Sequence, residues 1–81
     1  MRVTVRLFAR LRDVTGATEL VRQVAPGATI ATVWHDLVVE FPALGDYERS
    51  ISCAVNEDYA RMTHVLADGD DVAFLPPVSG G

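Results

Sequence analysis

The first stretch of the chain alternates between apolar and polar side chains, the period of two shown by a β-strand with one buried face. We therefore predict a strand over residues 2–10. A second β-prone run covers 19–24, and residues 11–16 break the alternation, so we expect a hairpin with a long turn. The buried parity of the first strand holds Val3, Val5, Leu7 and Ala9, and the opposite parity holds Arg2, Thr4, Arg6, Phe8 and Arg10.

Between residues 30 and 41 the apolar positions recur at the spacing of an α-helix. A Pro-Gly turn precedes this run and Pro42 ends it. Thr29 is the predicted N-cap, although Thr32 stands where a capping box usually has Glu or Gln. We expect one amphipathic helix, whose apolar side is formed by Ile30, Val33, Trp34, Leu37, Val38 and Phe41.

The remaining elements complete a fold of the α+β class. Two strands, one helix and then two or three strands are closed most simply by a mixed sheet of four to five strands packed on the helix. If the first and last strands are neighbours, they run parallel. We expect one domain over residues 1–76, followed by an extended, flexible tail over 77–81. The elements after the helix are predicted as a loop at 42–50, a strand at 51–55, a polar turn at 56–58, a short segment around Tyr59, a turn at 67–71 and a strand at 72–75.

The composition excludes several classes of function. With 81 residues and a formal charge of −4, the chain is one small acidic domain, which argues against nucleic acid as a partner. All seven basic residues are arginines, so no lysine is available for imine chemistry or for an isopeptide bond. The single cysteine cannot form an internal disulfide. No run approaches the roughly 20 apolar residues of a membrane span, and the N-terminus does not resemble a signal peptide, so we expect a cytoplasmic protein without membrane contact.

Few side chains are arranged for catalysis or metal binding. Cys53, His35 and His64 have no second ligand at a metal-binding spacing, so no metal site is predicted. Cys53 shares the buried parity of its strand and is expected to be an inert buried thiol. The acidic turn at 68–71 lacks the spacing of a calcium loop and is expected to be solvated. The chain is therefore not expected to catalyse a reaction alone.

The C-terminal residues are the most informative part of the sequence. Two prolines favour an extended exit from the domain, and the paired glycines leave the terminal carboxylate without a neighbouring side chain. Such a tail suits a narrow channel in a partner protein, although a frayed terminus would have the same composition. The segment reads Pro76-Pro77-Val78-Ser79-Gly80-Gly81.

A candidate docking surface lies beside this tail. If the first and last strands are neighbours, Phe8 and Leu75 share the open face of the sheet, and we expect Tyr59 to lie near them. An apolar patch with a charged rim on so small a protein is typical of a docking surface, while single exposed aromatic residues also occur without a function. The expected rim consists of Arg6, Arg10 and Arg12.

These residues resemble those of molybdopterin synthase small subunits, a family of sulfur carriers with the ubiquitin-like β-grasp fold. The resemblance covers the whole chain, and its most specific part is the ending, a Gly-Asp-x-Val strand and a Pro-Pro-Val-(Ser/Thr)-Gly-Gly tail. Glu57 departs from the family pattern, in which Gly is common, and this weakens the prediction of a tight hairpin there. The matching residues are Leu7-Phe8-Ala9, Leu11-Arg12-Asp13, Gly16, Phe41-Pro42, Ala54-Val55-Asn56 and the whole of 68–81.

The resemblance implies that sulfur is carried on Gly81. An adenylating enzyme related to ubiquitin-activating enzymes would use ATP and magnesium to form an acyl-adenylate there. A sulfur donor, such as a cysteine desulfurase or a rhodanese, would then leave a thiocarboxylate. The large synthase subunit would receive the tail and convert cyclic pyranopterin monophosphate to molybdopterin, in a heterotetramer of two large and two small subunits. This chain would bind no cofactor itself. By analogy its partner contacts are Phe8, Arg12, Tyr59 and Leu75, and its tail positions are Pro77, Val78, Ser79, Gly80 and Gly81.

Three other functions remain open at this point. A sulfur carrier for thiamine, cysteine or tRNA thiolation would use the same chemistry with a different recipient enzyme. A ubiquitin-like modifier would be joined to lysines of other proteins through Gly81. A plain interaction module would use the docking surface alone, and its tail would have no role.

Overall fold

The computed structural model describes residues 1–77. The predicted tail positions Val78, Ser79, Gly80 and Gly81 therefore lie outside the described residues. The elements run in the order β1 (Arg2–Leu7), α1 (Ala9–Thr15), β2 (Glu19–Gln23), α2 (Ile30–Glu40), the 3-10 helix η1 (Pro42–Tyr47), β3 (Ser52–Val55), β4 (Asp58–Ala60) and β5 (Asp71–Leu75).

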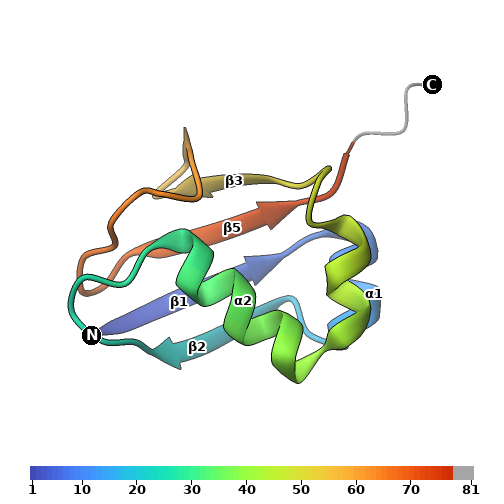
Figure 1. The fold of residues 1–81 in the computed structure, drawn as a ribbon, viewed down its shortest axis with the longest axis horizontal. Helices are drawn as coiled ribbons and strands as arrows, with labels where there is room; N and C mark the ends of the chain where they lie inside the picture. The colour runs from blue at the N-terminus through green and yellow to red at the C-terminus, as the bar shows by residue number, and fades with distance from the viewer. Residues whose placement is uncertain (78–81) are drawn as a thin grey trace.

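The strands form one five-stranded mixed sheet in the order β2-β1-β5-β3-β4 (Figure 1). The first and last strands are neighbours, and they run parallel, as expected for that case, with Val5 opposite Val72. The other pairs are antiparallel, and β3 pairs with β5 so that Cys53 lies opposite Phe74. This topology places the last strand, which leads to the tail, in the middle of the sheet.

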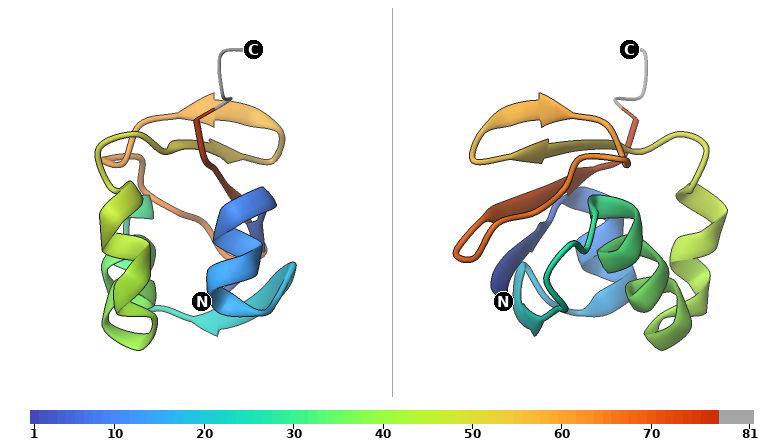
Figure 2. Two further views of the ribbon diagram at one scale, coloured as in Figure 1. Left: turned by 90° about the vertical axis from the view of Figure 1, so that its right-hand side faces the viewer. Right: turned by 60° about the vertical axis from the view of Figure 1, so that its left-hand side comes forward.

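One face of the sheet is covered by the helices, which lie together on one side of the curved sheet in the right-hand view of Figure 2. The alternation of β1 is confirmed, because Val3, Val5 and Leu7 are buried while Arg2 and Arg6 are exposed. The apolar stripe of α2 faces these side chains. The fully buried residues of the core include Leu7, Leu11, Ile30, Leu37, Leu44, Val72, Trp34 and Phe74.

Helix α2 begins as the sequence predicted, at the N-cap Thr29. The Thr29 hydroxyl accepts a hydrogen bond from the backbone N–H of Thr32 at 3.3 Å, and the backbone N–H of Thr29 donates to the Thr32 hydroxyl at 3.2 Å. A threonine therefore completes the capping box in the position that usually holds Glu or Gln. Satisfying both N–H groups fixes the point at which the chain turns onto the sheet.

Two predicted irregular segments are helical, which corrects the sequence analysis. The first strand ends at Leu7 rather than at residue 10, and α1 replaces the predicted long turn. Phe8 caps α1 with an extended backbone, and Gly16 ends it with a φ of 73° and an N–H bond to the Arg12 carbonyl. Leu11 is the buried residue of this seven-residue helix, and Val14, which is partly buried, also packs against the core. The predicted loop after α2 contains η1.

The β3–β4 hairpin is tight even though its turn lacks glycine. Val55 pairs with Asp58, so the loop has two residues, Asn56 and Glu57, with φ values of 50° and 74°. Positive φ at both positions is the pattern of a type I′ turn, in which Asn is favoured first and Gly second. The predicted tight turn is thus confirmed despite the departure at Glu57, which adopts the conformation that glycine adopts more readily.

Replacing Glu57 with glycine is expected to stabilise the domain. The substitution removes the steric cost of positive φ, and we expect the free energy of unfolding to rise by roughly 0.5–1 kcal/mol, measured by urea denaturation. Glu57→Ala is the matched control, because it removes the carboxylate and keeps the strained backbone. Equal stability of the two variants would contradict the assignment of strain to this residue.

Candidate functional site

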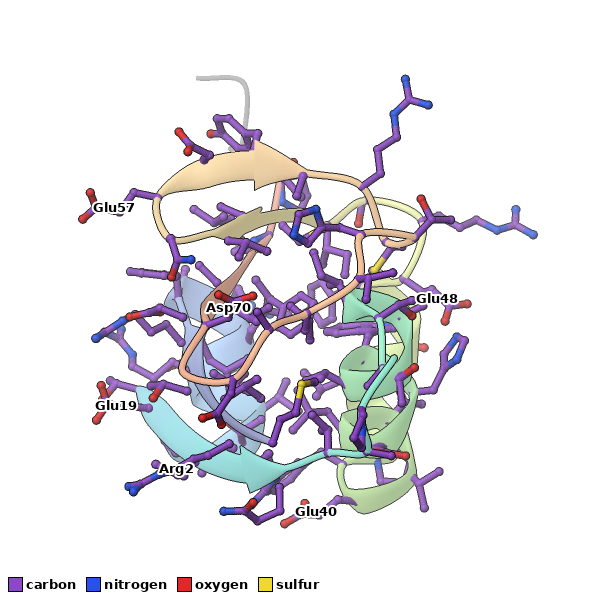
Figure 3. The ribbon with its side chains drawn as sticks, turned by 90° about the vertical axis from the view of Figure 1, so that its left-hand side faces the viewer. Arg2, Glu19, Glu40, Glu48, Glu57 and Asp70 are labelled. Carbon is purple, nitrogen blue, oxygen red and sulfur yellow. The ribbon has the colours of Figure 1, made fainter. Side chains whose placement is uncertain are left out.

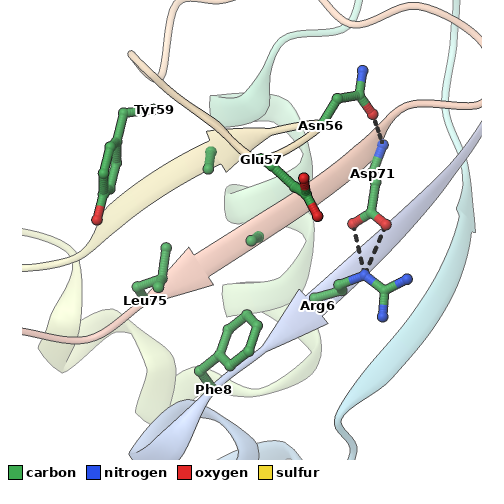
Figure 4. A pocket seen from close by; sticks show the side chains of 9 residues that line it. Arg6, Phe8, Asn56, Glu57, Tyr59, Asp71 and Leu75 are labelled. Atoms are coloured by element: carbon green, nitrogen blue, oxygen red, sulfur yellow. Dashed lines mark hydrogen bonds and ion pairs between the residues drawn. The ribbon is translucent and has the colours of Figure 1, made fainter.

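The open face of the sheet carries a groove of about 620 Å³ beside the point where β5 ends. Its floor is formed by two small residues, Ala54 on β3 and Ala73 on β5, which lie opposite each other in the register. Larger side chains rise around this floor (Figure 4). The groove is lined by Arg6, Phe8, Ala54, Asn56, Glu57, Tyr59, Asp71, Ala73 and Leu75.

One part of the groove is apolar. The exposed fraction of Phe8 is 44% and that of Tyr59 is 80%, and Leu75 is half-buried between them. These are three of the four contact residues expected from the sequence, and they come from the end of β1, from β4 and from β5. The parallel pairing of β1 and β5 brings Phe8 and Leu75 to the same face, although Phe8 lies just beyond the strand in which it was predicted.

Arg12, the fourth expected contact residue, lies outside this groove. It belongs to α1 and lines a neighbouring hollow together with Arg6 and Phe8. Of the three arginines expected at the rim, Arg6 lines the groove, and Arg10 is not among its lining residues. The difference follows from α1, because a helix in place of the predicted strand and turn carries Arg10 and Arg12 away from the sheet face.

The opposite part of the groove is polar and held by ion pairs. The Arg6 Nε atom lies 2.7 Å and 2.9 Å from the two carboxylate oxygens of Asp71, and Arg6 also pairs with Glu19 on β2 at 3.0 Å. The hydrogen bond and the charge of Asp71 raise the pKa of Arg6 above its ordinary value. These exposed pairs contribute little to stability, but they fix the guanidinium at the edge of the apolar part.

Asn56 ties the hairpin turn to the start of β5. Its side-chain oxygen accepts a hydrogen bond from the Asp71 N–H at 3.0 Å, and its amide donates to the Asp70 carboxylate at 3.0 Å. The Ala67 N–H donates to the same carboxylate at 2.8 Å. Asp70 lies on the loop that precedes β5 (Figure 3). The network fixes the polar end of the groove relative to its floor.

Asp70 makes the stability of this network dependent on pH. The hydrogen bond from Ala67, followed by that from Asn56, lowers the pKa of Asp70 in the folded protein. Its contribution to stability is therefore present above the ordinary aspartate pKa of about 3.9 and is lost as the pH falls through the lower folded-state pKa.

We expect Asp70→Asn to be less stable than the wild type at neutral pH, with the difference shrinking in acid. Urea unfolding midpoints measured from neutral pH to below about pH 3 test this expectation. Asp36→Asn, on the exposed side of α2, controls for the loss of one negative charge. A difference between wild type and Asp70→Asn that stays constant across this range would contradict the role of the Asp70 carboxylate.

Cys53 is buried, as the sequence predicted, with an exposed fraction of 5%. Its thiol donates to the Ala60 carbonyl at a distance of 3.1 Å, and burial raises the pKa of the thiol. Both effects disfavour the reactive thiolate. Across residues 1–77, no group of three or more His, Cys, Asp or Glu side chains is placed to hold a metal ion.

The groove lies beside the point where the chain leaves the sheet toward the tail, because β5 lines the groove and also leads into the tail. Leu75 lines the groove as the last residue of that strand, and the chain continues through Pro76 to the exposed Pro77. Within residues 1–77, no helix combines the length and the apolar character that a membrane span requires.

Of the polar part of the groove, the sequence predicted Arg6 and missed the others. The pattern places Asn56 and Asp71 in turns and gives Glu57 no role beyond the hairpin. The register of β3 on β5 brings these residues together, and that register is not visible in the pattern of either strand alone. The opposite charges of Arg6 and Asp71 could have indicated an ion pair at this site. Recognising that pair, however, required the parallel alignment of β1 with β5.

Comparison with known proteins places this geometry in a family. The model of the ThiS family matches residues 5–81 of the chain. The molybdopterin synthase sulfur carrier subunit of Arabidopsis thaliana is 34% identical over 79 residues, which cover 98% of this chain and 82% of that protein. The similarity therefore extends over nearly the whole chain, including the two terminal glycines.

Solved structures of the same fold agree with this assignment. The crystal structure of the small archaeal modifier protein SAMP1 from Haloferax volcanii matches with a TM-score of 0.86 and 31% identity, over 100% of both chains. A chain in the complex of subunits 1 and 2 of the molybdopterin-converting factor from Helicobacter pylori matches this chain with a TM-score of 0.71 and 23% identity, over 100% of both chains. This match shows a similar fold. The chain thus has the ubiquitin-like β-grasp fold and belongs to the ThiS family.

Proposed function

We propose that this protein is the sulfur carrier subunit of a molybdopterin synthase, and that sulfur is carried as a thiocarboxylate on Gly81. The proposal rests mainly on the match to the ThiS family, which extends to the last residue of the chain. It is supported by relatives that are named as molybdopterin synthase sulfur carrier subunits. Gly80 and Gly81 are within that match. The groove beside the exit of β5 supplies a surface on which partner enzymes can hold the domain while they act on the tail.

The chemistry requires the carboxylate of Gly81 to become an electrophile. On an adenylating enzyme with magnesium, the carboxylate attacks the α-phosphorus of ATP and pyrophosphate leaves. The resulting acyl-adenylate carries AMP, which is a good leaving group. Sulfide from a donor attacks the carbonyl carbon, the carbon–oxygen bond to AMP breaks, and the thiocarboxylate remains. In the large synthase subunit its sulfur is then transferred to cyclic pyranopterin monophosphate. The catalytic groups and the bound nucleotide belong to the partners in this scheme.

The groove explains how one small domain can serve several partners. Its apolar part presents Phe8, Tyr59 and Leu75, and the Arg6–Asp71 pair forms a polar border. A small apolar centre with a polar rim gives specific contacts of moderate affinity. The carrier can then leave the adenylating enzyme and bind the large subunit with the same face. The heterotetramer of two large and two small subunits is the assembly that we propose for delivery.

Intact-protein mass spectrometry tests the proposal. The chain is incubated with an adenylating enzyme, ATP and a sulfur donor, and we expect one oxygen to be exchanged for sulfur. A variant lacking Gly81 is the matched control and should show no gain. Because methionine oxidation adds almost the same mass, the gain is located on the C-terminal fragment and tested with a thiol alkylator in a Cys53→Ala background. Absence of activation with several adenylating enzymes would overturn the proposal.

A second function is favoured by the match to SAMP1, a protein named as a modifier. In that case the activated Gly81 would be joined to lysines of other proteins. Covalent adducts of this chain on cellular proteins, absent from the variant lacking Gly81, distinguish this function from sulfur transfer. Transfer to the thiamine, cysteine or tRNA pathways would instead appear as activity with a different recipient enzyme in place of the large synthase subunit.

A further inference from the structure

We propose that this carrier offers no lasting acceptor for its own activated C-terminus, so that the Gly81 acyl group can be passed only to other molecules. The inference rests on the proposed function, which makes the Gly81 carbonyl an electrophile. An amine that attacked this carbonyl would form a carbon–nitrogen bond as the bond to AMP or to a thiol broke. The amine would lose a proton to water, and a stable amide would join two carriers.

Side-chain amines are missing from the whole sequence. Its seven basic residues are all arginine, and the guanidinium group stays protonated in proteins and is a poor nucleophile. Several of these groups are also engaged, as in the pairs of Arg6 with Asp71 at 2.7 Å and of Arg22 with Glu40 at 2.6 Å. All basic side chains of the Lys and Arg class are thus arginine, which carries a positive charge without introducing an acylation site.

The amino group of Met1 is held within the sheet. It donates a hydrogen bond to the Val24 carbonyl at 2.7 Å, and the Val24 N–H donates to the Met1 carbonyl at 2.8 Å. This reciprocal pair extends the β1–β2 ladder by one residue, and Met1 is half-buried against the core. An attack by this nitrogen would require the end of the ladder to open first.

The sulfur nucleophile of the chain is sequestered as well. Cys53 is buried beneath the β3–β4 hairpin, and its thiol donates to the Ala60 carbonyl. The two histidines, His35 and His64, are exposed, but acyl-imidazoles hydrolyse in water and leave no lasting adduct. Hydroxyl groups are weak nucleophiles without an adjacent base. Within residues 1–77, neither an amine nor a thiol is therefore freely accessible to attack the Gly81 carbonyl.

This arrangement has two consequences for the proposed function. Activated carriers can accumulate at high concentration without cross-linking one another, because collisions between them bring no amine to the Gly81 carbonyl. If the chain acts as a modifier, each acceptor lysine receives a single copy, since an attached copy presents no lysine for the next.

The test uses the full chain with a Gly81 thioester, released from an intein fusion by a small thiol, so that no adenylating enzyme is needed. The thioester is incubated at high protein concentration in mildly alkaline buffer, and amide-linked dimers are measured by denaturing gel and mass spectrometry. Arg49→Lys and Arg10→Lys each place one amine at an exposed position away from the groove. Added methylamine shows in each sample that the thioester is reactive.

For the wild type we expect hydrolysis without amide-linked dimers, and for both lysine variants we expect such dimers with the added lysine as the acceptor. Dimers of the wild type at the rate of the variants would overturn the proposal, because they would reveal an acceptor on the chain. Absence of dimers from the lysine variants, with methylamine still acylated, would also overturn it. Failure of adenylating enzymes to activate Gly81 would count against the proposed function and would leave this result unchanged.

Discussion

Leu75→Asp is expected to raise the Kd for a partner enzyme by roughly a hundredfold, which corresponds to about 3 kcal/mol of binding free energy. Leu75 lies in the apolar part of the groove, between Phe8 and Tyr59 (Figure 4). Aspartate there removes an apolar contact and places a charge that a bound partner would bury without a counterion. The affinity of each variant for the large synthase subunit, measured by titration calorimetry, tests the effect.

Val39→Asp is the matched control for this experiment. Val39 is 82% exposed on α2, which covers the other face of the sheet, so the same charge is added where no docking is proposed. Phe8→Asp is a second variant of the groove that should keep the fold, because Phe8 is the N-cap of α1 and Asp is a preferred N-cap residue. Equal losses of affinity in Leu75→Asp and Val39→Asp would contradict the prediction. They would show that the added negative charge weakens binding wherever it is placed, and not that the groove contacts the partner.

Phe74→Ala is expected to unfold a large part of the population. Phe74 is fully buried, and its ring lies 5.1 Å from that of Trp34, between the sheet and α2. Truncation of a buried phenylalanine costs about 3–5 kcal/mol, and a domain of this length has a total stability of roughly 4–12 kcal/mol. Urea denaturation followed by the fluorescence of Trp34, the single tryptophan of the sequence, measures the loss.

Trp34→Phe provides the comparison for Phe74→Ala. The indole Nε1 atom is buried, and among residues 1–77 it has no hydrogen-bond partner. Replacing the indole by a phenyl ring removes this unsatisfied donor while most of the apolar contact remains, so the loss should be smaller than that of Phe74→Ala. Circular dichroism follows this variant. A larger loss for Trp34→Phe would mean that the indole ring, rather than Phe74, determines the packing between α2 and the sheet.

The sequence predicted the elements that have a long apolar pattern. The alternation of Val3, Val5 and Leu7 identified β1, and the helical spacing of Val33 and Leu37 identified α2. The sequence allowed the first and last strands to be a parallel pair if they were neighbours, and the structure shows that they are neighbours. The groove residues Phe8 and Leu75 followed from that pair, because they were expected on the face that the helix leaves open.

The parts that were missed are short or depend on contacts distant in sequence. Helix α1 packs only Leu11 and the partly buried Val14 against the core, and two apolar positions are too few to show a helical period. Arg12 was therefore expected beside the groove, whereas it lies on that helix. Asn56 joined the candidate site through the register of β3 on β5, which no local pattern specifies.

The central position of β5 determines how the domain responds to force. The strand is hydrogen-bonded to β1 on one side and to β3 on the other, and the chain leaves its end through Pro76 and Pro77. A partner that pulls on the tail therefore loads both ladders along their length, so that many bonds must break together instead of opening one after another. This loading geometry resists extraction of the strand, so a force applied to the chain beyond Pro77 is borne by the sheet as a whole.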